Sequence, residues 1–144
     1  MSDLNLRRDY VEVRGIVFFA RMLDKIRANA QGKLPPDYNL GMKNPESFDA
    51  RFCRFWEVDF NKISARTLEG GTDEEIFDAV FAGRKINPEH VLVWNDFLIK
   101  RGWRDEASEE LEHDKKARGF ADRKDIQTFV DFHDGDEGRK PKYS

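Results

Sequence analysis

The sequence feature that most constrains the fold is a helix-start pattern that recurs three times. Asn44, Thr72 and Asn87 are each followed by proline or acidic residues within the next three positions. An Asn or Thr side-chain oxygen can accept a hydrogen bond from the free N–H groups of a first helical turn, where proline and acids are favoured. The pattern predicts that a helix begins at each of these positions.

Apolar residues at helical spacing predict further helices. Ile16, Phe19, Leu23 and Ile26 share one face of a helix expected over 13–30. The other helices are expected from Asn44 to 56, over 60–68, from Thr72 to 81, over 87–99, over 105–119 and from about residue 125. No run of alternating apolar and polar residues indicates a strand. The sequence therefore predicts an all-α fold, a compact orthogonal bundle of about six to seven short helices with no significant sheet.

Composition along the chain predicts where some of these segments lie. Between Val91 and Ile99 almost every residue is apolar, which predicts a central, nearly fully buried helix. The stretch 33–43 contains prolines and a glycine and has no helical period, so we expect a long connecting loop. We expect a single domain over residues 1–144, with flexible ends at about 1–10 and 135–144.

The overall composition limits the class of protein. The chain has 144 residues, of which 37% are charged, and a net charge of −3, which indicates one folded domain with a well-solvated surface. It has no apolar run of the roughly 20 residues that cross a bilayer, no recognisable secretory leader and one cysteine, Cys53. We therefore expect a cytoplasmic protein that does not enter membranes. Interleaved charges of both signs make nucleic acid an unexpected partner.

Several catalytic and metal-binding patterns are incomplete. Glu110 and His113 have the spacing of paired metal sites, but the pattern occurs once, on the most polar segment. The acids around His133 do not match a calcium loop, and Cys53 lies among aromatic residues, which favours a buried structural thiol. The acids after Thr72 oppose phosphate binding at that helix start. We expect no metal site, no cofactor and no catalytic motif.

Basic residues beside large aromatic side chains form the pattern that best suggests a ligand site. Arginine binds carboxylates and other anions through forked hydrogen bonds, and aromatic rings line small-molecule pockets. The predicted ligand-binding residues are Arg21, Lys25, Asp49, Arg51, Arg54, Trp94, Asn95, Trp103 and Arg104. The same residues could instead anchor one helix to another, with Asp24 and Asp49 as internal partners. The sequence leaves both interpretations open.

Five blocks of the chain, taken in order, resemble one protein family. They are 20–28, 48–52, 70–76, 94–108 and 121–129. The family is a domain of unknown function found in short bacterial proteins, and the resemblance covers nearly the whole chain. It implies a stand-alone bacterial helical protein of about 140 residues, with no assigned activity, cofactor or partner and no site residues to carry over.

Three functional hypotheses follow. The leading one is a non-enzymatic binding module in which the loop 33–43 and the Arg and Trp residues hold a small anionic ligand or an acidic protein segment. The second is a homo-oligomer or adaptor that buries surplus aromatic residues such as Phe18 and Phe132 in an interface. The third is a small enzyme in which Asp24 or Asp49, held by arginine, acts as a general base.

Overall fold

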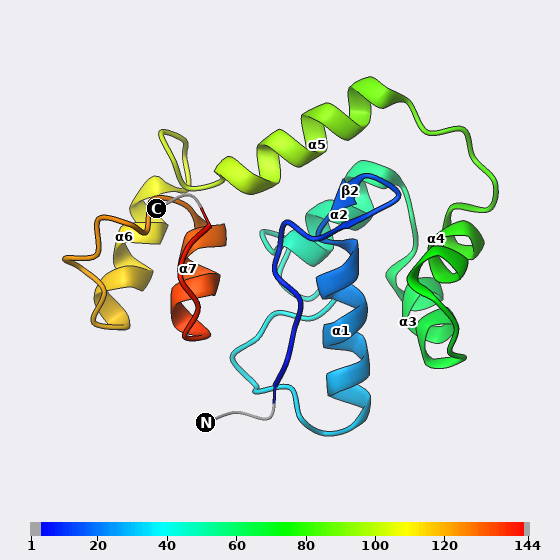
Figure 1. Ribbon diagram of the computed structural model, residues 1–144, viewed down its shortest axis with the longest axis horizontal. Helices are drawn as coiled ribbons and strands as arrows, with labels where there is room; N and C mark the ends of the chain where they lie inside the picture. The colour runs from blue at the N-terminus through cyan, green and yellow to red at the C-terminus, as the bar shows by residue number, and fades with distance from the viewer. Residues whose placement is uncertain (1–3, 143–144) are drawn as a thin grey trace.

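The computed structural model describes residues 4–142, and these residues form seven helices and one short hairpin (Figure 1). The elements are β1 (Glu12–Val13), β2 (Ile16–Val17), α1 (Phe19–Ala30), α2 (Phe48–Trp56), α3 (Phe60–Leu68), α4 (Asp73–Phe81), α5 (Pro88–Lys100), α6 (Ser108–Ala117) and α7 (Phe129–Asp136). The prediction of a mostly helical fold is confirmed.

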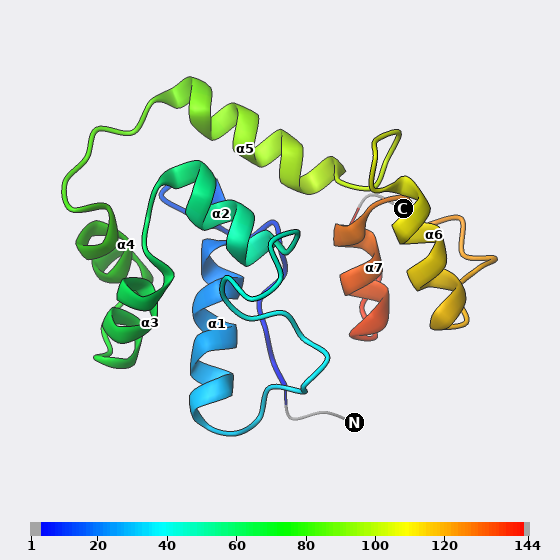
Figure 2. The ribbon, with the colours of Figure 1, turned by 180° about the vertical axis from the view of Figure 1, so that it is seen from behind.

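Helix α1 lies in the middle of the molecule. Helices α3 and α4 lie on one side of it, α6 and α7 lie on the other, and α5 spans the distance between the two groups (Figures 1 and 2). The first half of α1 is buried nearly all round, from Phe19 to Leu23. This central position is the one that the sequence suggested for the segment 87–99.

The main core is built around aromatic rings of four helices, α1, α2, α4 and α5. Phe19 of α1 contacts the rings of Phe52 and Phe77 at centroid distances of 5.6 and 5.4 Å. Trp94 of α5 meets Phe52 edge to face at 5.4 Å, and Phe81 closes the cluster. Such edge-to-face pairs add to the free energy gained by burying the rings. A smaller cluster of Leu111, Ile126 and Phe132 joins α6 to α7.

The prediction of a helix from residue 13 was wrong for its first six residues. Strands β1 and β2 pair antiparallel there, with Val13 opposite Ile16. Arg14 and Gly15 have φ values of 53° and 80°, which suit the two-residue turn of a tight hairpin. The apolar side chains at this spacing reach the core from the hairpin, and α1 begins only at Phe19.

The prediction that the segment 87–99 is central and nearly all buried was also wrong. In α5 the buried side chains are Trp94 and Leu98, whereas Leu92 and Val93 are 56% and 48% exposed. The reason is positional: α5 lies across the outside of the molecule and packs against β2 and α7. Apolar composition alone did not reveal how few faces of the helix meet a neighbour.

Two of the three predicted helix starts are confirmed. The Thr72 hydroxyl accepts from the Glu75 N–H and the Glu75 carboxylate accepts from the Thr72 N–H, a complete capping box. Asn87 caps α5. Asn44 does not cap α2: its side chain accepts from the Glu46 N–H in the preceding turn, and Ser47 is the N-cap.

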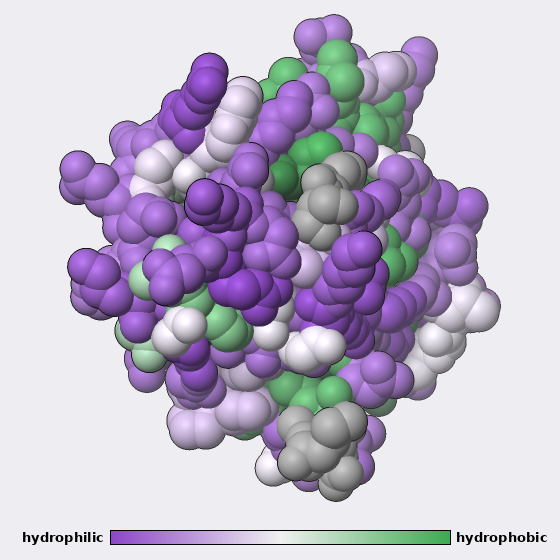
Figure 3. Space-filling model, turned by 60° about the vertical axis from the view of Figure 1, so that its left-hand side comes forward, coloured by the Kyte–Doolittle hydropathy of each residue, from purple (hydrophilic) through white to green (hydrophobic). Residues whose placement is uncertain are grey.

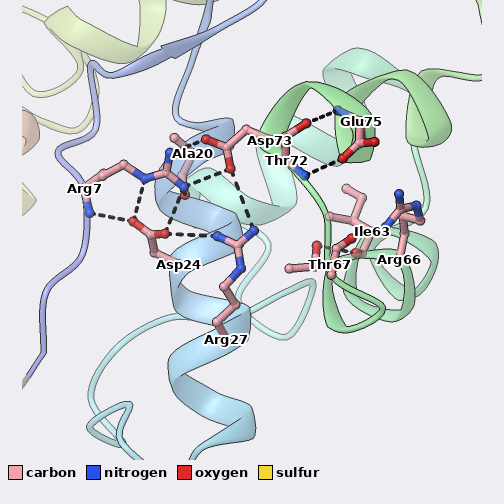
Figure 4. Close-up of polar contacts among 11 residues, drawn as sticks. Arg7, Ala20, Asp24, Arg27, Ile63, Arg66, Thr67, Thr72, Asp73 and Glu75 are labelled. Atoms are coloured by element: carbon pink, nitrogen blue, oxygen red, sulfur yellow. Dashed lines mark hydrogen bonds and ion pairs between the residues drawn. The ribbon is translucent and has the colours of Figure 1, made fainter.

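The described residues at the two ends of the chain make specific contacts with the rest of the molecule. Leu6 and Asp9 are buried, and the Arg139 guanidinium donates to the Leu6 carbonyl at 2.6 Å. Arg7 lies between Asp24 of α1 and Asp73 of α4 and binds both carboxylates (Figure 4). The hydrogen bonds from Arg7 lower the pKa of Asp73. Residues 1–3 and 143–144 lie outside the described residues.

The hairpin is held by two adjacent side chains of α5. The Trp94 indole donates to the Val17 carbonyl at 3.0 Å. The Asn95 side chain accepts from the Val17 N–H at 3.1 Å and donates to the Gly15 carbonyl at 2.9 Å. Asn95 therefore satisfies one backbone group of β2 and one of the turn that precedes it.

Replacing Asn95→Ala removes both of these hydrogen bonds, and we expect the free energy of unfolding to fall by about 1–3 kcal/mol. Urea denaturation measures this loss. Asn29→Ala is the matched control, because Asn29 is exposed near the end of α1, and it should change stability by less than about 0.5 kcal/mol. An equal effect of the two substitutions would contradict the role given to Asn95.

Candidate ligand-binding site

A pocket of about 380 Å³ lies among α1, the loop between α1 and α2, α6 and α7. This volume is within the range of small-molecule sites. Phe18, Phe48, Phe129 and Phe132 contribute apolar surface, and charged side chains make up much of the remaining wall. Figure 3 views the molecule from the side that carries α6 and shows a mostly hydrophilic surface with separate hydrophobic patches.

A network of buried charges lies behind this pocket. Asp9 has no exposed surface and sits 3.4 Å from the Arg21 guanidinium and 2.8 Å from Nδ1 of His133. Arg21 also donates to the Glu137 carboxylate at 3.1 Å, and the Tyr38 hydroxyl donates to Glu137 at 3.0 Å. The network thus joins the N-terminal segment, α1, the long loop and the end of α7.

The charged partners of Asp9 decide its ionisation. Burial by itself would raise the pKa of this carboxyl group, but the charges of His133 and Arg21 outweigh it and hold the pKa below its ordinary value. Asp9 is therefore a buried carboxylate with positive partners on two sides.

His133 connects this network to the pocket. Its Nδ1 faces Asp9, its ring lines the pocket, and its side chain is 30% exposed. The ring also meets Phe48 edge to face at 6.0 Å. Because a carboxylate can only accept, the proton shared by this pair is carried on Nδ1 of His133, and Nε2 lies on the opposite edge of the ring.

Some of the charged side chains that line the pocket have a strong ion-pair partner within the protein, and others do not. Four basic and six acidic side chains line the pocket. Each basic one already has an acidic partner: Arg21 has Glu137, Lys25 has Asp49, Arg101 has Asp105 and Arg118 has Asp37. Within residues 4–142, Glu110 forms no ion pair, and the partner of Asp114 is the exposed His113.

Two of the predicted ligand-binding residues, Arg21 and Lys25, line this pocket together with the loop 33–43 that was expected to take part. Asp49 lies behind Lys25. Its carboxylate binds the Lys25 ammonium at 2.7 Å and accepts from the Gly41 N–H at 2.7 Å, while Lys25 donates to the Asn39 carbonyl. This arrangement fixes the loop against α1 and α2.

The structure places the other predicted site residues away from the pocket. Arg54 donates to the Pro45 carbonyl, and Arg51 binds Glu46 and lies over the Phe97 ring, so both hold the turn before α2. Trp94 and Asn95 hold the hairpin.

Trp103 and Arg104 form a separate surface feature. The Arg104 guanidinium lies 4.9 Å from the Trp103 ring centroid, and Trp103 is 46% exposed beside a second depression that Asp131 also lines. Neither residue lines the pocket between α1 and α7.

The sequence did not reveal most of the polar residues that line the pocket or lie directly behind it. Asp9 and His133 are 124 positions apart, so no local spacing could pair them. Glu110 was considered only as half of a metal motif. The available signal was the prediction that His133 is a hydrogen-bonded packing residue on the apolar stripe of the last helix.

The remaining candidate chemistries gain no support. Burial raises the pKa of the Cys53 thiol to about 12, so the thiolate is disfavoured. Among the described residues, no three His, Cys, Asp or Glu side chains are grouped to hold a metal ion. No helix within 4–142 is long and apolar enough to cross a membrane.

Asp134 gives a pH-dependent prediction. Its side chain is 2% exposed, and burial, with the charge of nearby Asp9 adding to it, raises its pKa to about 6. Between the unfolded value near 4 and the folded value, the folded state binds the proton more tightly, so stability falls as pH rises through this window.

Asp134→Asn should therefore gain stability relative to the natural protein as pH rises, by about 1–3 kcal/mol between about pH 4 and pH 7. Urea denaturation at both pH values measures the difference. The exposed Asp122 supplies the control Asp122→Asn, for which the difference should not vary with pH. A constant difference for Asp134→Asn would contradict the destabilising charge.

The comparisons with known proteins give a family without an assigned activity. The model of a domain of unknown function, DUF5069, matches residues 4–139. No curated protein matches the sequence at a significant level. The match covers α1 to α7 with the hairpin and the pocket. On this evidence the chain belongs to the DUF5069 family.

Proposed function

We propose that the protein is a small-molecule-binding module whose site is the pocket among α1, the loop 33–47, α6 and α7. The observation that carries this proposal is the pocket of about 380 Å³, in which four phenylalanines and polar groups of several elements converge. Convergence of apolar surface with a few placed polar groups is typical of ligand sites.

The rigid frame behind the pocket supports the proposal. The contacts of Asp9, Arg21 and Glu137 fix the floor, and Lys25 with Asp49 fixes the loop that forms one wall. Fixed lining groups bind a ligand with less loss of conformational entropy than mobile ones.

The charge of the ligand is a separate question. A small anion or acidic segment stays a prediction from the sequence, and Arg21, Lys25, Arg101 and Arg118 are the groups that would bind it. To do so they must exchange existing acidic partners. Of these pairs, that of Arg118 with Asp37 is exposed and the easiest to open.

The two other hypotheses lose the observations that suggested them. Phe18 and Phe132, proposed as surplus interface aromatics, are buried in the clusters of this chain. Asp24 binds Arg7 and Arg27, and Asp49 binds Lys25 and a backbone N–H, so both proposed general bases act as structural partners. Neither carboxylate lines the pocket.

Filling the pocket tests the proposal. Ala117 of α6 lines the pocket and is exposed, so Ala117→Trp should reduce ligand binding without disturbing the core. A ligand at about 100 times its Kd stabilises the natural protein by about 2.7 kcal/mol, which raises Tm by roughly 8 °C. Thermal denaturation against a panel of amines, carboxylates, phosphates and neutral compounds measures this shift.

The matched control is Ala121→Trp, because Ala121 is exposed in the α6–α7 connection and does not line the pocket. The control should keep the full ligand-induced shift, whereas Ala117→Trp should lose most of it. Equal shifts in both variants, or no shift with any class of compound, would overturn the proposed site.

A further inference from the structure

We infer that the pocket binds an organic amine in its protonated form, a ligand with an ammonium group that carries N–H donors and an apolar body. This inference rests on the proposed function and names the ligand class for the same pocket. It is carried by the lining groups that the protein leaves without a strong partner, because these are the groups a ligand can satisfy.

The free charges of the pocket are negative. Glu110 and Asp114 lie one turn apart on α6 and both line the pocket. Residues four apart share one face of a helix, so the two carboxylates present their charge together. Within the described residues Glu110 has no ionic partner, and Asp114 faces only His113, whose side chain is 82% exposed.

The positive groups of the pocket are already neutralised. Arg21 binds Glu137 and approaches Asp9, and Lys25 binds Asp49, each within a buried pair. Removing one partner from such a pair leaves an uncompensated buried charge, which is costly. An anion would have to displace these partners, whereas a cation meets carboxylates that are open.

His133 adds a ring nitrogen that has no partner among the described residues. Asp9 holds Nδ1, and the two ring nitrogens lie on different edges of the imidazole, so Nε2 is on the edge away from Asp9 while the ring lines the pocket. No described residue is a hydrogen-bond partner of Nε2. An imidazole ring protonated on Nδ1 alone leaves Nε2 as an acceptor, to which an ammonium N–H can donate.

The aromatic rings of the pocket also suit an amine ligand. Phe48 and Phe132 line the pocket, and both rings contact the His133 ring. The faces of phenyl rings attract ammonium groups, and their apolar surface suits the carbon body of an amine. Two carboxylates, an imidazole acceptor and phenyl rings together match a ligand that is a donor, positively charged and partly apolar.

The test compares four probes with one aromatic body: benzylamine, benzyltrimethylammonium, benzyl alcohol and benzoate. NMR titration of isotopically labelled protein at about pH 8, above the ordinary pKa of a free imidazole, follows the His133 ring and the α6 amides. Benzylamine should bind in the millimolar range expected of so small a ligand. Benzyltrimethylammonium, which keeps the charge but lacks N–H donors, should bind at least about tenfold more weakly, and benzoate more weakly still.

Variants assign the contacts. Glu110→Gln and Asp114→Asn should each weaken benzylamine binding by about three- to tenfold. Glu109→Gln is the matched control, because Glu109 lies on the same helix and does not line this pocket, and its affinity should be unchanged. Circular dichroism and amide spectra confirm that each variant is folded.

The outcomes separate this inference from the proposed site. If benzoate or benzyl alcohol binds as tightly as benzylamine, and Ala117→Trp abolishes that binding, the pocket is a ligand site but the amine class is overturned. If benzylamine binding survives Ala117→Trp, or if no probe perturbs the spectra at about 20 mM, the pocket assignment and the amine class are both overturned.

Discussion

The carboxylate of Asp9 is the group on which the arrangement of the other parts depends. It has no exposed surface, and it lies between Arg21 of α1 and His133 of α7. A buried charge is tolerated only when partners compensate for lost hydration, so the N-terminal segment, α1 and α7 must meet at this point. Glu137 then pairs with the far side of Arg21. The two ends of the chain are therefore joined to the central helix by electrostatics, whereas aromatic packing joins α1 to α2, α4 and α5.

This arrangement also determines the chemical character of the pocket. Arg21 and His133 present part of their side chains to the cavity, but their charge or proton is directed toward Asp9 and Glu137. The basic groups thus stabilise the wall, and the groups left for a ligand are acceptors. Residue counts alone give a different impression, since arginine and lysine beside aromatic rings suggest an anion site. What matters for recognition is which charges remain uncompensated after folding.

Local features of the fold could be predicted from the sequence, and features that depend on distant partners could not. Thr72 and Asn87 cap helices through bonds to residues two or three positions away, so their pattern is visible in the chain. Arg21 and Lys25, one turn apart beside a long loop, were placed in the site for the same reason. The hydrogen bonds of Asn95 to the hairpin and of His133 to Asp9 join residues 78 to 124 positions apart. The exposure of Leu92 depends on where α5 lies in the fold. Arg51 and Arg54 were predicted to bind the ligand, because the spacing of residues in the sequence does not show whether a guanidinium is free or already bonded to a nearby backbone carbonyl.

The measurement that tests this account most directly is a double-mutant cycle for Asp9 and Arg21, with Asp9→Asn, Arg21→Gln and the pair, each followed by urea denaturation near neutral pH. A buried pair that organises the structure should show a coupling energy of about 1.5–3 kcal/mol, because either single substitution already breaks the ion pair between Asp9 and Arg21, so the second has no such pair left to break. A coupling energy below about 0.3 kcal/mol, with additive single effects, would show that the two residues act independently and would contradict the central role of Asp9.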